Sequence, residues 1–162
     1  MMLIGGCGYR FVADSGTRLP SNQKVWVAYF ENNTVYLNAS VAMKRALFDQ
    51  FAAMRGILAA GKPEDGDLVV EGKITGYGAN VMSYTAADTA KEYRLIVTAE
   101  VIVRRKADGK NAKPFWKGTV SGWQDYPVAA TIEQQRNNED AALLVACRKL
   151  SQQVIWNMER NY

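Results

Sequence analysis

YRLIVTAEVIVRR, residues 93–105, is the stretch of sequence that decides the fold. Apolar and polar side chains alternate along it, and a period of two is typical of a β-strand with one buried and one exposed face. The face expected to be buried carries Tyr93, Leu95, Val97, Ala99, Val101 and Val103, and the opposite face carries Arg94, Thr98, Glu100 and Arg104. Because a sheet must bury its apolar face against another layer, this stretch predicts a layered domain.

Two further stretches with similar alternation flank it. Residues 68–78 precede it and residues 115–126 follow it, and the turn-forming pair Asp108-Gly109 separates the last two strands. We therefore expect the three strands to form an antiparallel meander.

Glycine recurs on the apolar faces of both outer strands. Glycine inside a strand usually marks the close approach of another element, so we expect a helix to lie across Gly72 and Gly76. Gly118 and Gly122 repeat the same small-residue pattern in the last strand.

Two helices and one more strand complete the predicted domain. Residues 24–30 are rich in β-branched and aromatic side chains, as in a buried strand. Residues 37–60 change to helical spacing, and residues 131–160 form a longer helix in which Thr131 and Gln134 fit a capping box. The stripe expected to be buried on the first helix is Leu37, Val41, Leu47, Phe48, Phe51, Met54 and Leu58. The stripe on the second is Leu143, Cys147, Leu150, Val154 and Met158.

The resulting order, β-α-β-β-β-α, predicts an α+β fold. Its simplest form is a two-layer sandwich in which a four-stranded sheet carries both helices on one face, with a right-handed crossover through the first helix. The helix-free face would then expose Lys73, Tyr77 and Trp123, and it is either a partner-contacting surface or a half-covered sheet.

The composition excludes several classes of function. The 162 residues contain no histidine, which removes histidine-based triads and most zinc and iron sites. No run of 18 apolar residues is present, and a net charge of +4 is too small to indicate nucleic acid. Three acids of the last helix, Glu133, Glu139 and Asp140, are expected to lie solvated on its polar face. We expect no catalytic residue, no cofactor, no metal and no nucleic-acid partner.

The N-terminus, MMLIGGC, is similar to the tail of a bacterial lipoprotein signal, in which small residues precede a cysteine that receives diacylglycerol. It predicts a lipidated Cys7 and a tether within residues 1–23, followed by a single domain at 24–162. Two alternatives stay open: Cys7 is an ordinary thiol, or it forms a disulfide with Cys147. We expect Cys147 to be a buried small hydrophobe.

Several short motifs follow one another along this succession of elements. They are Cys7-Gly8-Tyr9-Arg10-Phe11, Leu19-Pro20, VWVAYFENNT at residues 25–34, Glu92-Tyr93-Arg94-Leu95, and Trp116 in the fourth strand. Their order and spacing, over nearly the whole chain, resemble the lipopolysaccharide-assembly lipoprotein family LptE.

The resemblance implies a triacylated, non-catalytic lipoprotein on the periplasmic face of the outer membrane. Such a protein plugs and helps assemble the β-barrel LptD, and takes part in delivering lipopolysaccharide to the outer leaflet. The implied partners are an LptD-like barrel, lipopolysaccharide, and the membrane through the acyl anchor. Alternative functions are an auxiliary lipoprotein of an ABC-type lipid transporter and a periplasmic small-molecule-binding domain.

A run of cations surrounds the predicted turn between the last two strands. Lysine and arginine pair with phosphates, so this end of the sheet is a candidate lipopolysaccharide-binding site. The alternative is a solvated hairpin tip. The candidate residues are Arg104, Arg105, Lys106, Lys110 and Lys113, with Lys117 beside them and Arg94 as a weaker candidate on the polar face of the third strand.

Overall fold

A computed structural model describes residues 22–109 and 112–160. The predicted lipidation site Cys7 and the candidate Lys110 lie outside these residues. In chain order the elements are β1 (Lys24–Val27), β2 (Glu31–Asn32), α1 (Ala39–Arg55), β3 (Leu58–Ala59), η1 (Pro63–Asp65), β4 (Leu68–Tyr84), β5 (Ala90–Arg105), η2 (Lys106–Asp108), β6 (Trp116–Pro127) and α2 (Ile132–Arg160).

The strands form one mixed sheet in the order β3-β1-β4-β5-β6, with β2 also paired to β4. The predicted meander is confirmed, because β4, β5 and β6 are antiparallel neighbours. The sheet differs from the predicted four strands by two short additions, β2 and β3. Both run parallel to their neighbours, β2 along β4 and β3 along β1.

The predicted first strand is split because its last residue turns into the core. After β1 the Ala28 amide still donates to the Val70 carbonyl at 2.9 Å, but Phe30 then places its ring over Gly72. The chain rejoins the edge of β4 as β2. The first helix is also shorter than predicted, since Gly56 adopts a left-handed conformation (φ 64°) directly after Arg55 and ends it.

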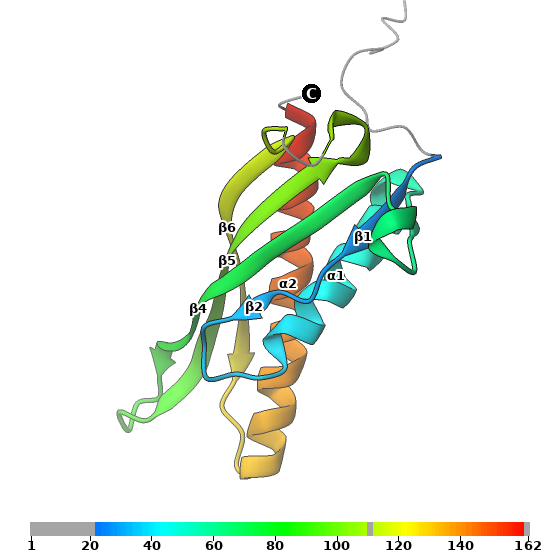
Figure 1. Ribbon diagram of the computed structural model, residues 1–162. Helices are drawn as coiled ribbons and strands as arrows, with labels where there is room; N and C mark the ends of the chain where they lie inside the picture. The colour runs from blue at the N-terminus through cyan, green and yellow to red at the C-terminus, as the bar shows by residue number, and fades with distance from the viewer. Residues whose placement is uncertain (1–21, 110–111, 161–162) are drawn as a thin grey trace, which may run out of the picture.

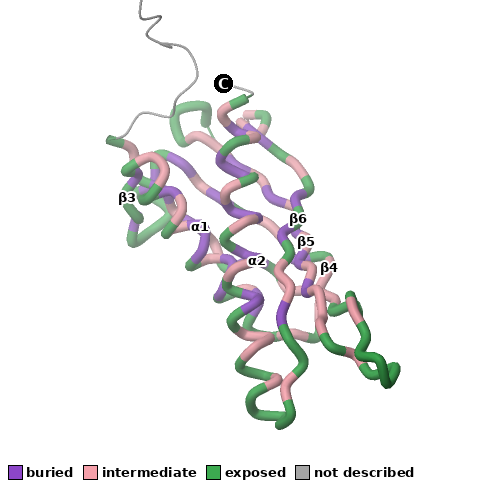
Figure 2. The backbone as a smooth tube through the Cα atoms, turned by 180° about the vertical axis from the view of Figure 1, so that it is seen from behind, coloured by how far each residue is buried: buried purple, intermediate pink, exposed green. Residues whose placement is uncertain are grey.

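Both helices lie on the same side of the sheet, as the sequence predicted (Figure 1). In Figure 2 the buried residues lie along the helices and the strands that they cover, whereas the tip of the β4–β5 hairpin is exposed. The buried side chains of β5 are Leu95, Val97, Ala99, Val101 and Val103, and the predicted stripe of α2 is buried throughout. The N-cap half of the capping box predicted for α2 is confirmed, because the Gln134 amide donates to Thr131 Oγ1 at 3.2 Å.

The buried stripe of α1 differs from the prediction. Leu37, Val41 and Leu58 are exposed, at 85%, 59% and 64%. Leu47 and Phe51 of the predicted stripe are buried, as expected, and they share the buried face of α1 with Ala39, Ala42, Met43 and Ala46. The small alanines allow α1 to approach its neighbours closely, so the helix is rotated away from the stripe that its larger side chains suggested.

The helix that crosses a glycine lies over β6 rather than β4. A Cβ atom built on Gly122 would lie 2.0 Å from the Ala146 carbonyl oxygen, so the backbone of α2 occupies that space. At Gly72 the covering group is the Phe30 ring, 2.6 Å from the corresponding Cβ position. Gly76 faces the opposite side of the sheet, where its nearest neighbour is the side chain of Thr98. The predicted helix across Gly72 and Gly76 is therefore wrong.

The cause at Gly76 is a register irregularity in β4. The pairing of β4 with β5 shifts between Ile74 and Gly76, which reverses the alternation beyond that point. Tyr77 consequently points toward α2, not toward the helix-free face as predicted. Lys73, which precedes the shift, faces Glu100 across the strands with a Nζ–Oε2 distance of 3.5 Å.

Candidate functional site

The predicted lipopolysaccharide-binding cations gather at the end of the sheet where β5 turns into β6. Two of them end β5, one begins η2, one lies in the loop that follows, and one lies in β6. The described members, which we call the basic end, are Arg104, Arg105, Lys106, Lys113 and Lys117.

The basic end does not form a single face. Successive residues of a strand point to opposite sides, so Arg104 lies on the helix-free face and Arg105 on the other. Arg105 stacks on the Phe115 ring, 3.9 Å from its centroid, and lies 3.6 Å from an oxygen of Asp108. Lys117 pairs with Ile102 in the ladder, which places it on the same face as Arg104.

Some cations of the basic end already interact with acidic residues or backbone carbonyls of the same chain. Lys106 donates from its ammonium to the Glu64 carbonyl oxygen. Arg104 donates to the Ala112 carbonyl oxygen at 3.3 Å. Within residues 22–109 and 112–160, Arg104, Lys106, Lys113 and Lys117 form no ion pair. The positive charge of these four side chains is therefore available to an anionic ligand.

Arg94 belongs to a different group of side chains, further along the helix-free face. It holds Asp125 through two hydrogen bonds, Nε–Oδ1 at 2.6 Å and Nη2–Oδ2 at 2.8 Å. These bonds hold the pKa of Asp125 below its usual value. The Arg94 guanidinium also lies 3.9 Å from the centroid of the Trp123 ring, and Lys149 Nζ lies 4.4 Å from that centroid.

Trp123 is 44% exposed on the helix-free face, as predicted. Lys149 reaches it from α2, because β6 is the edge of the sheet and a long side chain can pass around it. Sequence reasoning found Arg94 and Trp123 but not Asp125 or Lys149. Knowledge of the register, in which Arg94 faces Asp125, would have identified the ion pair.

Two acids of α2 have a structural role that the sequence did not reveal. Tyr36 and Tyr77 stack with ring centroids 4.6 Å apart, and their hydroxyls donate to Asp140 and Glu139 respectively. Burial, followed by these hydrogen bonds, raises the pKa of both tyrosines. The prediction that Glu139 and Asp140 are merely solvated is wrong. Their hydrogen bonds connect the segment before α1, through Tyr36, and strand β4, through Tyr77, to α2.

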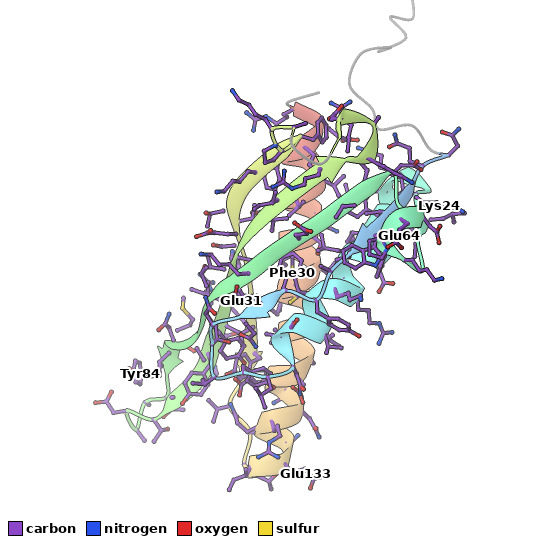
Figure 3. The ribbon with its side chains drawn as sticks, viewed as in Figure 1. Lys24, Phe30, Glu31, Glu64, Tyr84 and Glu133 are labelled. Carbon is purple, nitrogen blue, oxygen red and sulfur yellow. The ribbon has the colours of Figure 1, made fainter. Side chains whose placement is uncertain are left out.

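The hairpin between β4 and β5 projects beyond the layer of helices (Figures 1 and 3). We call residues 80–92 the arm. Three large apolar side chains on it are exposed: Val81 at 36%, Met82 at 45% and Tyr84 at 61%. The sequence prediction ended the strand at residue 78, and the register irregularities near Val81 and Ser83 explain why no simple alternation marks the extension.

A shallow apolar groove lies between the segment before α1 and the first turns of α2. Its volume is about 610 Å³, and it is open to solvent. Val35, Leu37 and Ile132 line it and are 96%, 85% and 83% exposed. Together with the arm, this groove gathers several of the exposed large apolar side chains at the end of the molecule opposite the basic end, while others, such as Tyr29, Leu58 and Trp156, are exposed elsewhere.

Neither long helix of the described chain has the combination of length and apolar composition needed to cross a membrane. The same part of the chain holds no group of three acidic or cysteine side chains arranged to bind a metal ion.

The fold is a small two-layer α+β domain in which two helices cover one face of a mixed sheet. Within that fold class the family is clear: the profile of the LptE family, described as lipopolysaccharide-assembly, matches residues 22–158. The chain belongs to the LptE family, whose members are non-enzymatic lipopolysaccharide-assembly lipoproteins of the cell envelope.

Solved structures share the fold at low sequence identity. A protein from Xanthomonas campestris superposes with a TM-score of 0.60 at 10% identity, covering 88% of this chain and 87% of that one. A candidate lipoprotein from Caulobacter crescentus CB15 gives a TM-score of 0.57 at 11% identity, with coverages of 84% and 88%. The PelC dodecamer from Paraburkholderia phytofirmans gives 0.54 at 13% identity, with coverages of 87% and 90%. No curated protein matches the sequence.

Proposed function

We propose that this chain is an outer-membrane lipoprotein, anchored by acyl groups on Cys7, that plugs an LptD-like β-barrel and helps it to assemble. In this role it takes part in delivering lipopolysaccharide to the outer leaflet. The observation that carries the proposal is the family match, which spans the whole helix–sheet body. Several acyl chains on one cysteine provide the multiple signals that stable anchoring requires.

The arm supports a docking role within this proposal. A two-stranded ribbon is only marginally stable alone in water, and Val81, Met82 and Tyr84 of the arm are exposed. A barrel wall that covers these three side chains would bury their apolar surface and stabilise the two-stranded ribbon. The Trp123 region of the helix-free face is a second surface that a surrounding barrel would contact.

Purification from detergent-solubilised membranes tests the function directly. We expect the chain to co-purify with a very large β-barrel, and the intact mass of the chain to show acyl groups on Cys7. Co-purification with a permease complex would instead indicate an auxiliary lipoprotein of a lipid transporter. An unmodified chain in the soluble fraction without a barrel would contradict the proposal.

The same purification identifies the docking surface. Replacing Met82 and Tyr84 together by serine is expected to weaken the complex with the barrel about tenfold or more, because apolar contact area is lost. Leu144→Ser with Trp156→Ser is the matched control, since those side chains are 50% and 53% exposed on α2. Equal losses in both double variants would contradict a specific role for the arm.

We assign lipopolysaccharide contact to the basic end. The phosphates of lipid A are anionic. Arg104, Lys106, Lys113 and Lys117 are the described cations of the basic end that form no internal ion pair, and of these Arg104 and Lys106 each donate to a backbone carbonyl. Arg104 and Lys117 share the helix-free face, so they can contact one ligand together. Arg105, which is paired with Asp108, contributes less, and Arg94 is committed to Asp125, whereas Lys106, like Arg104, is hydrogen-bonded only to a backbone carbonyl.

Reversing two of these charges tests the assignment. Arg104→Glu with Lys117→Glu is expected to weaken lipopolysaccharide binding about tenfold, through lost phosphate contacts and added repulsion. Arg45→Glu with Arg148→Glu makes the same change of net charge on the outer surface of the two helices, and serves as the control. Binding should be measured at several salt concentrations. Equal effects of the two double variants would show a general charge effect and would remove the basic end as a site.

A further inference from the structure

The outer edge of β6 has features of a pairing site for another strand. Within the described residues β6 pairs only with β5, over twelve residues, so its other edge carries unpaired backbone groups. Folded proteins usually protect such an edge with proline, a bulge, a charged side chain such as lysine, or a covering element. The one lysine of β6, Lys117, lies at its start. Between Trp116 and Tyr126 this strand has no proline, and its ladder with β5 runs without a bulge.

The contacts at the end of β6 establish which backbone groups point outward. The Val128 amide donates to the Lys91 carbonyl, so even-numbered residues face β5. The carbonyls of Trp123 and Pro127 accept bonds from the side chains of Lys149 and Asn138, at 3.0 and 3.1 Å. In an antiparallel ladder the inward and outward residues alternate. The outward set is therefore Lys117, Thr119, Ser121, Trp123 and Asp125.

Only the C-terminal part of this edge, from Trp123 to Pro127, has hydrogen-bond partners from within the described part of the molecule. Lys149 occupies the Trp123 carbonyl, and Asn138 occupies that of Pro127. The amides and carbonyls of Lys117, Thr119 and Ser121 have no backbone or side-chain partner in the part of the chain that the structure describes. This leaves a continuous five-residue edge, 117–121, open for pairing.

We propose, on the basis of the proposed function, that this edge pairs with an extended segment of the barrel partner by β-strand addition. Backbone groups in this alternating pattern are complemented by another extended backbone. The cations Lys113 and Lys117 lie at the upper end of the edge without ion-pair partners among the described residues, so an acidic side chain in the incoming segment would be complementary.

The position of α2 determines whether the incoming strand can carry a helix on the same face of the sheet. The contact between Gly122 and the Ala146 carbonyl places the helix directly above β6. A second copy paired antiparallel about Ser121 would bring a second α2 within about 5 Å, the spacing of strands, whereas packed helices need about 8–10 Å. A single extended segment carries no helix over its strand and therefore avoids this clash.

Amide hydrogen exchange in the purified complex with the barrel tests the proposal. In the isolated chain the amides of Lys117, Thr119 and Ser121 should exchange quickly, while those of Val120 and Gly122, which face β5, should be protected. In the complex, the three outward amides should exchange at least about tenfold more slowly. A complex in which they exchange as fast as in the isolated chain overturns edge pairing and leaves the proposed function intact.

The other outcomes are also decisive. Failure to isolate any complex with a barrel overturns the proposed function, and the pairing proposal with it. Protection that increases with concentration of the isolated chain identifies a second copy as the occupant and overturns the assignment to the barrel. As a variant, Thr119→Pro removes one outward amide and should weaken the complex about five- to tenfold, whereas Thr119→Ala, which keeps that amide, should not.

Discussion

Replacing Gly122 with valine is expected to lower the free energy of unfolding by about 3 kcal/mol or more, the upper range for overpacking a core. The new Cβ would lie 2.0 Å from the Ala146 carbonyl oxygen and 3.0 Å from Leu150 Cβ. The obstructing atom belongs to the backbone of a long helix, so it cannot move like the tip of a flexible side chain. The helix must lift from β6, and the packing of Cys147 and Leu150 between the layers is lost with it.

Gly78→Val is the matched control for this prediction. It introduces the same side chain into an interior position of a strand, but a Cβ atom built there meets nothing within 4 Å. Valine favours extended backbone, so the change in stability should stay below about 1 kcal/mol. Denaturant unfolding followed by far-ultraviolet circular dichroism measures both variants. If Gly122→Val unfolds at the same denaturant concentration as Gly78→Val, α2 does not rest on Gly122.

The sequence predicted the parts of the fold in which a single period dominates. The alternation in 93–105 located β5 and its buried face. The stripe from Leu143 to Met158 located the buried face of α2, and the capping residues Thr131 and Gln134 located its start to within one residue. These elements bury large side chains at regular intervals, so local pattern and tertiary packing agree. The layered arrangement followed, because few architectures bury such faces together.

The failures arose where the deciding partner is distant in sequence. In the sequence, Ile74 and Gly76 continue the alternation of β4. Only the pairing of β4 with β5 reveals the register shift between them. In α1 two stripes compete, and close packing against other elements favours the one that contains alanines over the one that contains Val41. The local pattern of a helix does not determine which tertiary neighbours it packs against.

The candidate site shows the same division. Local composition identified the basic end, and the strand period alone would have separated Arg104 from Arg105, because adjacent residues of a strand face opposite sides. The pairing of Arg94 with Asp125 and the reach of Lys149 around β6 depend on long-range register and on the edge position of that strand. A pattern within one segment cannot supply either of these.

The free energy of unfolding is expected to fall steeply between pH 9 and pH 12, and Cys147 is a principal cause. Its thiol has no exposed surface, and burial raises its pKa from 9.0 to about 12. In the unfolded chain the thiol loses its proton near pH 9, whereas the folded protein retains it until about pH 12. Stability is therefore complete below pH 9 and declines as the pH rises through this window, by up to about 4 kcal/mol for a shift of this size.

Cys147→Ala separates this contribution from that of the tyrosines. Burial also raises the pKa of Tyr126, to about 12, so both proteins should lose some stability at alkaline pH. At pH 8 the variant should be less stable than the parent by about 1 kcal/mol, because a buried sulfur atom is lost. By pH 11 the order should reverse, since alanine has no proton to lose. Both chains carry Cys7→Ser, so that Cys147 is the only thiol in the parent. Parallel stability curves for the two proteins from pH 8 to pH 11 would show that Cys147 ionises as readily in the folded chain as in the unfolded one, and that the space between α2 and the sheet admits water.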